Sequence, residues 1–166
     1  MPRVVLFQPE IPPNTGNVAR TCAATASDLH LIEPLGFSLE DRYLRRAGLD
    51  YWPLVRLHSH RDGAAFLKEQ ERLGGRLVAL SARASGDYSH FRFQASDWLL
   101  FGRESDGLPQ ELLERADARL TIPMEVSAQQ GQTGVRSLNL SVAVGVVLFE
   151  ALRQLRDTNP ASGSVD

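Results

Sequence analysis

The sequence has little cysteine: Cys22 is the single one among 166 residues. A chain with one cysteine forms no internal disulfide, and this usage is typical of a reducing compartment. The four histidines, His30, His58, His60 and His90, lack the spacing and the cysteine neighbours of a zinc site. We therefore expect no metal ion.

Long hydrophobic runs and a strong charge of one sign are also missing. No apolar stretch approaches the roughly 18 residues of a membrane span, and the residues before the first apolar run are too few for a signal peptide. The formal net charge of −2 excludes a global basic field, so a nucleic-acid partner would need a local basic patch. We expect a cytoplasmic protein without membrane association.

Three common active-site motifs are absent. The sequence contains neither G-x-G-x-x-G nor G-x-x-x-x-G-K-[ST], which argues against a usual dinucleotide-binding fold and against a nucleotide hydrolase. It has no G-x-S-x-G turn, and Cys22 has no histidine close in sequence to activate it. The sequence therefore shows no residues arranged for hydrolysis through a covalent intermediate.

What the sequence does contain is a series of short apolar runs alternating with helical patterns. We expect one domain over residues 1–156 and a polar flexible tail over 157–166. Fully apolar runs between helices are typical of an α/β fold with a mainly parallel sheet flanked by helices. The predicted strands are 4–7, 29–32, 54–57, 77–80, 98–101 and 119–122, and the later helices are 39–47, 64–73, 110–116 and 138–156.

The segment from Pro9 to Cys22 joins the first strand to the first helix. Its three prolines oppose regular structure, and Asn14 or Thr15 can cap the helix. Small residues recur on one side of this helix and predict close packing, while Arg20 lies on a different face. An ordinary capped helix with a solvated arginine is the simpler interpretation. The small residues are Ala19, Cys22, Ala23 and Ala26.

Two further loops follow predicted strands, where ligands bind in parallel sheets. Gly102 and Gly107 bracket Glu104, a spacing that allows a close approach of the backbone to a ligand. Ser137 is a candidate cap for the last helix. Each feature alone is a common turn or cap.

Taken together and in this order, four motifs closely resemble the SPOUT-class tRNA (cytidine/uridine-34) 2′-O-methyltransferases. The resemblance runs from about residue 4 to residue 156. The motifs are Pro12-Pro13-Asn14-Thr15-Gly16-Asn17-x-x-Arg20, Leu44-Arg45-Arg46-Ala47-Gly48-Leu49-Asp50-Tyr51, Phe101-Gly102-x-Glu104-x-x-Gly107-Leu108-Pro109, and Ile122-Pro123-Met124 followed by Ser137-Leu138-Asn139-Leu140-Ser141.

The resemblance implies a deep C-terminal trefoil knot, an exception to the rule that chains do not thread themselves. It also implies S-adenosyl-L-methionine as the cofactor and a homodimer that builds each active site from both subunits. By position Arg20 would be the catalytic residue, beside the ribose 2′-hydroxyl, with Glu104 and Asn139 in supporting roles. The residues expected to contact the cofactor are Leu80, Gly102, Ile122 and Ser137.

The implied activity is methylation of the ribose 2′-hydroxyl at the wobble nucleotide of tRNA, position 34, cytidine or modified uridine, in leucine tRNAs. Two alternatives stay open: an RNA-binding dimer without turnover, and a 2′-O-methyltransferase for another tRNA or rRNA position. The stretch between Met124 and Arg136 is longer than the family's usual link and is rich in Gln and Gly. This departure leaves the register of cofactor contacts, and the substrate preference, open.

The role of Arg20 can be judged from its pKa. Holding a guanidinium neutral at pH 7 costs about 7 kcal/mol, which argues against a free general base. A charged guanidinium instead stabilises a developing alkoxide and grips a phosphate bidentately. We expect Arg20 to orient the substrate and stabilise charge, with any base function supplied by the substrate phosphate or by a pKa-shifted state of Arg20.

A local basic patch is present despite the net charge. Between residues 41 and 61 five arginines stand against two aspartates, an excess of +3. Arg45 and Arg46 lie on one predicted helix face with Tyr51 just beyond, and arginines beside aromatics suit phosphates and unpaired bases. We expect Arg45 and Arg46 to bind tRNA, although a solvated helix face is the alternative.

The last helix is apolar over four turns and must be buried. The sequence does not say whether it is buried within the monomer or between subunits, and the resemblance favours the second. The apolar residues are Leu140, Val144, Val147, Leu148 and Leu152.

Overall fold

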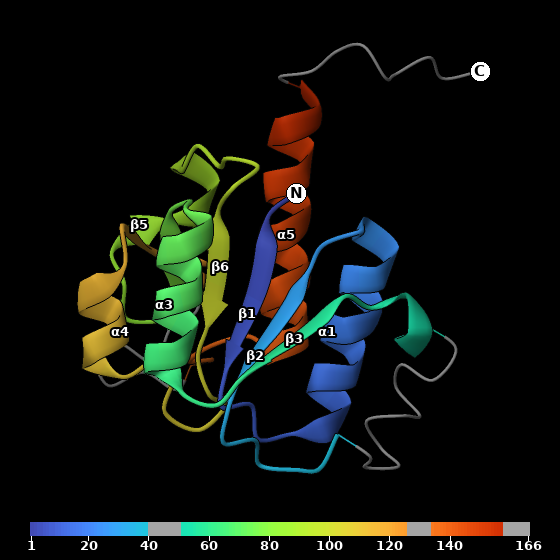
Figure 1. Ribbon diagram of the computed structural model, residues 1–166. Coiled ribbons are helices and arrows are strands. Elements are labelled where there is room, and N and C mark those ends of the chain that lie inside the picture. The colour runs from blue at the N-terminus through green and yellow to red at the C-terminus, as the bar shows by residue number, and fades with distance from the viewer. Residues whose placement is uncertain (40–50, 126–133, 158–166) are drawn as a thin grey trace.

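The chain folds around a seven-stranded sheet in which every pairing is parallel (Figure 1). The computed structural model describes residues 1–39, 51–125 and 134–157. The strand order is β3-β2-β1-β6-β4-β7-β5. The predicted α/β class with a mainly parallel sheet is therefore confirmed. The strands are β1 Arg3–Phe7, β2 Leu29–Ile32, β3 Leu57–His60, β4 Leu77–Leu80, β5 Gly86–Asp87, β6 Trp98–Phe101 and β7 Ala118–Thr121.

Helices cover both faces of the sheet, which explains the continuous apolar runs in its central strands. Helices α1 (Pro12–Thr25) and α5 (Leu140–Asp157) lie on one face, and α3 (Gly63–Leu73) and α4 (Gln110–Arg115) on the other (Figure 1). Alternate residues of β1 enter two separate cores: Val4 and Leu6 pack beneath α1 and α5, whereas Val5 and Phe7 pack beneath α3 and α4. Side chains alternate along a strand, so a buried strand needs apolar residues at every position.

Helix α1 starts earlier than its prolines suggest. Pro12 and Pro13 occupy the first helical positions, and the N-cap residue is Ile11, whose side chain makes no capping bond. The prediction that Asn14 or Thr15 caps the helix is therefore wrong, because proline fits the first turn, where its missing N–H would be unpaired anyway.

Small residues bring α1 close to α5, as predicted. Ala19 and Cys22 are fully buried where the two helices pack together. Ala26 was expected in the same stripe, but it is the exposed C-cap in a left-handed conformation with φ of 52°. The packing fixes the backbone of α1, and so the position from which Arg20 extends.

The third strand differs from its prediction. The predicted strand 54–57 is replaced by a 3-10 turn, η1 (Trp52–Leu54), and β3 begins only at Leu57. Pro53 favours the turn, and β3 is an edge strand whose polar residues hide it from an apolar pattern. The two-residue β5 was not predicted. The predicted helix 39–47 lies almost wholly outside the described residues, as does most of the tail, although Asp157 still belongs to α5.

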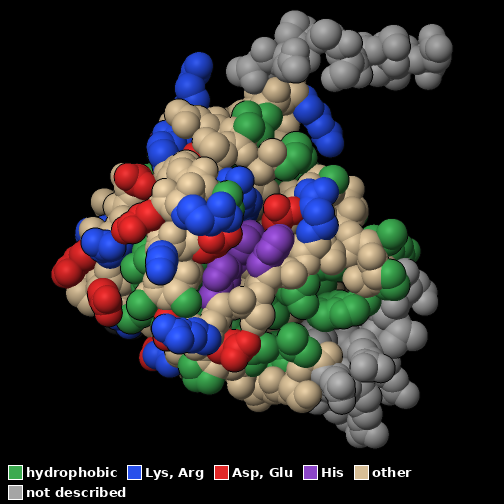
Figure 2. Space-filling model, in the orientation of Figure 1, with side chains coloured by type: hydrophobic (Ala, Val, Ile, Leu, Met, Phe, Trp, Pro, Cys, Tyr) green, Lys and Arg blue, Asp and Glu red, His purple; other side chains and the backbone are tan. Residues whose placement is uncertain are grey.

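Three histidines from β2 and β3 form a cluster on the α3 side of the sheet, where Figure 2 shows them gathered mid-face. The rings of His30 and His58 stack with centroids 4.4 Å apart, and His30 Nδ1 lies 2.9 Å from His60 Nε2. Burial, followed by repulsion from His58 and His60, lowers the pKa of His30 to about 3. Burial also lowers the pKa of His60. Both histidines are therefore neutral near pH 7.

This cluster predicts loss of stability in acid. The folded state takes up a proton at His30 only near pH 3, whereas the unfolded chain does so near 6.5, so stability is full above pH 6.5 and falls as the pH drops. Between pH 7 and pH 5, His30 should remove about 2 kcal/mol from the free energy of unfolding. Urea unfolding at both pH values measures this loss.

Two variants separate the contribution of His30 to this pH dependence from that of other titrating groups. His30→Leu should flatten the dependence, whereas His90→Gln, at an exposed position, should leave it unchanged. Equal pH dependence in the wild type and His30→Leu would contradict the assignment.

Candidate functional site

The carboxyl ends of three neighbouring strands bring three of the predicted cofactor residues to one edge of the sheet. Leu80 ends β4, Gly102 follows β6 and Ile122 follows β7. Register pairs Leu80 with Phe101 on one side and with Leu120 on the other, so the three ends are level. Leu80 and Ile122 are partly buried. The edge offers apolar side chains beside backbone groups, a combination that suits an adenine ring.

The loop after β6 is tightly closed, and Gly102 makes this possible. Arg103 and Gly107 exchange two backbone hydrogen bonds of 3.1 and 3.0 Å, and Gly107 has a φ of +79°. A Cβ on Gly102 would lie 2.2 Å from the carbonyl carbon of Gly107, which is far inside contact distance. Only glycine fits at position 102 with the loop in this conformation.

This loop places Glu104 against the start of α1. Its carboxylate accepts hydrogen bonds from the backbone N–H groups of Glu10 (2.9 Å) and Ile11 (3.3 Å), and from Asn14 Nδ2 (3.1 Å). A carboxylate is stabilised at a helix N-terminus by the unpaired N–H groups and the helix dipole. Glu104 therefore ties the two residues just before α1, and Asn14 in its first turn, to the loop after β6.

Asn14 links Glu104 to the start of the last helix. Asn139 Nδ2 donates to Asn14 Oδ1 at 2.9 Å, while Asn139 Oδ1 accepts from the backbone N–H of Ser141 at 2.9 Å and from its hydroxyl at 2.8 Å. Asn139 is thus the residue that caps α5. The prediction of Ser137 as the cap is wrong; Ser137 is exposed two residues earlier, and its contact with a cofactor stays a prediction.

A second carboxylate, on the segment before α1, binds the loop after β6. Glu10 accepts from the backbone N–H and the hydroxyl of Ser105 at 3.0 and 2.9 Å. Arg103 pairs with both carboxylate oxygens of Asp106 at 2.7 Å and donates to Gln8 Oε1 at 3.1 Å. Sequence reasoning missed Glu10, Ser105 and Gln8, because nothing in a 95-residue separation signals their contact.

Arg20 lies on the exposed side of α1, close to the aromatic ring of Tyr51. The guanidinium carbon is 4.7 Å from the ring centroid, and Nη2 is 3.5 Å from the Tyr51 hydroxyl. In the described parts of the chain, no ion pair involves Arg20. Its charge is therefore not neutralised by a described carboxylate.

Two arginines of the predicted basic patch lie beside carboxylates. Arg56 forms an ion pair with Asp28, and Arg61 lies 3.4 Å from Asp62. Arg45 and Arg46 lie outside the described residues. Their binding to tRNA stays a prediction.

Cys22 is a packing residue rather than a nucleophile. Its side chain is fully buried, and burial raises the pKa of its thiol to about 12. The thiol stays protonated at neutral pH and has no path to a substrate.

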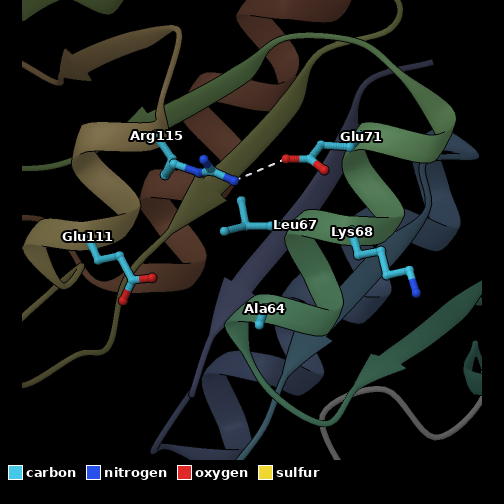
Figure 3. Close-up of a pocket in the computed structure, with 6 residues that line it drawn as sticks. All are labelled: Ala64, Leu67, Lys68, Glu71, Glu111 and Arg115. Atoms are coloured by element: carbon cyan, nitrogen blue, oxygen red, sulfur yellow. Dashed lines mark hydrogen bonds and ion pairs between the residues drawn. The ribbon is translucent and has the colours of Figure 1, made fainter.

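Two other features lie away from this edge. Asp28, His30 and His58 present ligand-type atoms within 4.8 Å of one another, which spacing in the sequence did not reveal. The rings of His30 and His58 are stacked, and Asp28 also forms an ion pair with Arg56. A pocket between α3 and α4 contains the ion pair of Glu71 and Arg115, 3.0 Å apart, on the face opposite α1 (Figure 3).

The fold and this edge define an α/β protein with a candidate cofactor site at the carboxyl ends of parallel strands. Residues 1–149 match the SpoU rRNA methylase family, and the chain belongs to that family. No helix among the described residues is long and apolar enough to cross a membrane.

Individual known proteins are similar to this chain over most of its length. The chain is 50% identical to a tRNA (cytidine(34)-2'-O)-methyltransferase of Burkholderia cenocepacia, over 91% of this chain and 94% of the relative. A solved structure described as giving insight into 2-OH methylation of C/U34 on tRNA is 54% identical, with a TM-score of 0.86, covering 95% of this chain and 97% of that one. An AdoMet-bound rRNA methyltransferase of Sinorhizobium meliloti is 28% identical, with a TM-score of 0.79, over 93% of this chain and 56% of that one.

These likenesses confirm the SPOUT fold class. The trefoil knot stays a prediction, and residues 126–133, between β7 and α5, lie outside the described part of the chain.

The closed loop makes a direct prediction for Gly102. Gly102→Ala should lower the free energy of unfolding by about 1–3 kcal/mol, because the new Cβ forces the backbone of Gly107 away. Gly63→Ala is the matched control: its nearest atom is 4.0 Å away, and the change should cost nothing. Urea unfolding of the three proteins measures the difference, and equal stability of the two variants would refute the close contact.

Proposed function

We propose that this protein transfers the methyl group of S-adenosylmethionine to the ribose 2′-hydroxyl of nucleotide 34 in tRNA, and that leucine tRNAs are its substrates. The observation that carries the proposal is the likeness, over more than nine tenths of the chain, to relatives named for this reaction. The cofactor supplies an electrophilic methyl group on a sulfonium. The chain must then hold the acceptor hydroxyl in line and stabilise the charge that develops on its oxygen.

Arg20 is suited to the second task. It is exposed, lies outside any ion pair of the described chain, and extends from a helix fixed by buried small residues. A charged guanidinium stabilises a developing alkoxide and holds a neighbouring phosphate. Because neutral arginine is costly at pH 7, we assign Arg20 to charge stabilisation, and we assign removal of the hydroxyl proton to a phosphate oxygen of the substrate.

The sheet edge is suited to the cofactor. Leu80 and Ile122 present partly buried apolar surface, and Gly102 lets the loop after β6 close against the same edge. We assign Leu80, Gly102, Ile122 and Ser137 to cofactor binding. Glu104, Asn14 and Asn139 hold the surrounding loops together through hydrogen bonds of 2.9–3.1 Å.

A homodimer is the proposed assembly, and its interface differs from the one expected from the last helix. The apolar residues of α5 first assigned to that interface, among them Val144 and Leu148, are buried within the protomer itself. Two others stay half exposed, Val142 at 50% and Phe149 at 52%. They are seven residues apart and so share one side of α5. We propose that this side meets a second copy.

Substrate contact completes the proposal. Arg45 and Arg46 would bind the tRNA backbone, and the protein would act in the cytoplasm, where tRNA is modified. A dimer that binds RNA without turnover, or one that methylates another tRNA or rRNA position, would give different outcomes in the test below.

The test is a methyl-transfer assay on purified protein with leucine tRNA, analysed by nucleoside mass spectrometry. We expect 2′-O-methylation at position 34, and none on a tRNA with a 2′-deoxynucleotide there, because the acceptor is gone. Arg20→Lys keeps the charge but loses the planar pair of donors needed for bidentate hydrogen bonding, and should lower the methylation rate at least about tenfold. Arg72→Lys, on α3, is the matched control and should keep the wild-type rate.

Three results would contradict the proposal. Methylation at another position would show that nucleotide 34 is not the substrate. Absence of turnover with retained tRNA binding would favour the RNA-binding dimer. A wild-type rate for Arg20→Lys would show that bidentate binding by Arg20 is not needed.

A further inference from the structure

We propose that Tyr51 is a positioning residue for Arg20: its ring holds the guanidinium in the orientation that methyl transfer requires. This inference rests on the proposed function and adds to it a residue from outside the sheet edge. It concerns how a long, exposed side chain on α1 is kept in one place.

Arg20 needs such a restraint. A free arginine side chain samples many rotamers, and this freedom is lost when it is fixed for reaction. Ion pairs fix many arginines of this chain, such as Arg103 with Asp106 and Arg76 with Asp97. In the described residues Arg20 has no carboxylate partner, and its contacts are with Tyr51.

The geometry is that of a cation lying over an aromatic ring. The guanidinium carbon is 4.7 Å from the ring centroid, within the roughly 6 Å over which such contacts are attractive. The distance from Nη2 to the hydroxyl, 3.5 Å, is at the limit for a hydrogen bond, so the ring face carries the contact. This stacking restrains Arg20 while leaving its charge intact.

Tyr51 is itself held in place. It directly precedes η1, where Leu54 N–H donates to the Tyr51 carbonyl at 2.8 Å and Val55 N–H donates to the Trp52 carbonyl at 3.1 Å. Trp52 packs against the core beneath α1, and η1 contacts α1. Both partners therefore extend from fixed backbone, Arg20 from α1 and Tyr51 from the turn beside it.

A different role for Tyr51 would be direct stacking on an RNA base, since 38% of its surface is exposed. The two roles differ in what they predict. A base-stacking residue acts on tRNA affinity and acts independently of Arg20, whereas a positioning residue acts on the rate and only through Arg20.

The experiment compares Tyr51→Leu and Tyr51→Phe in the wild-type and Arg20→Met backgrounds. With tRNA and S-adenosylmethionine saturating, Tyr51→Leu should lower the single-turnover rate about three- to fivefold, the size expected of an exposed cation–π contact. Tyr51→Phe keeps the ring and should stay within about twofold of the wild type. The dissociation constant for tRNA should be unchanged in both, and Tyr51→Leu should have no further effect in Arg20→Met.

A second readout does not depend on turnover. The Nε–H proton of Arg20, assigned by its loss in Arg20→Lys, should show a ring-current shift in the wild type and in Tyr51→Phe, and should lose it in Tyr51→Leu. The proposal is overturned if Tyr51→Leu leaves both rate and shift unchanged, or if it weakens tRNA binding and acts equally in the Arg20→Met background. Failure of the proposed function looks different: the wild type itself would not methylate position 34.

Discussion

The site depends on one carboxylate at the start of a helix. Glu104 accepts the N–H groups of Glu10 and Ile11 at 2.9 and 3.3 Å, and so joins the loop after β6 to the start of α1, more than 90 residues earlier. Asn14 extends this contact to Asn139, which caps α5. Three segments far apart in the sequence are thereby held at one edge of the sheet. A charged acceptor is effective here because helix N-termini present unpaired N–H groups and a partial positive charge.

The rest of the architecture follows from close packing around that edge. Ala19 and Cys22 let α1 approach α5, which fixes the helix from which Arg20 extends. Gly102 lets the loop after β6 close, which aims Glu104 at α1. The arginine proposed for charge stabilisation and the sheet edge proposed for the cofactor thus both lie on parts of the fold whose positions are set by small residues. Because these positions have no spare volume, the site tolerates little change behind it.

Much of the fold was predictable because buried parallel strands carry continuous apolar runs, as β4, β6 and β1 after Arg3 do. The edge strand β3 was placed three residues too early, since its polar residues carry no such pattern. The predicted cap of α1 was also wrong, because two prolines fill the first turn and move the start of the helix to Pro12, with Ile11 as an N-cap residue that makes no side-chain bond. The histidine cluster was invisible for a related reason: parallel pairing brings His30 beside His58, and spacing along the chain does not show it. Motif order indicated Glu104 and Asn139, but only the structure shows that Asn14 joins them.

The central claim, that Glu104 holds the start of α1 in place, is tested most directly by amide hydrogen exchange in the wild type and Glu104→Ala. The account predicts that the N–H groups of Glu10 and Ile11 exchange at least about tenfold faster in the variant, since a charge-assisted bond of over about 1.4 kcal/mol is lost. The amide of Leu6, inside β1, should keep its rate and serves as the internal reference. Unchanged exchange at Glu10 and Ile11 would contradict the account.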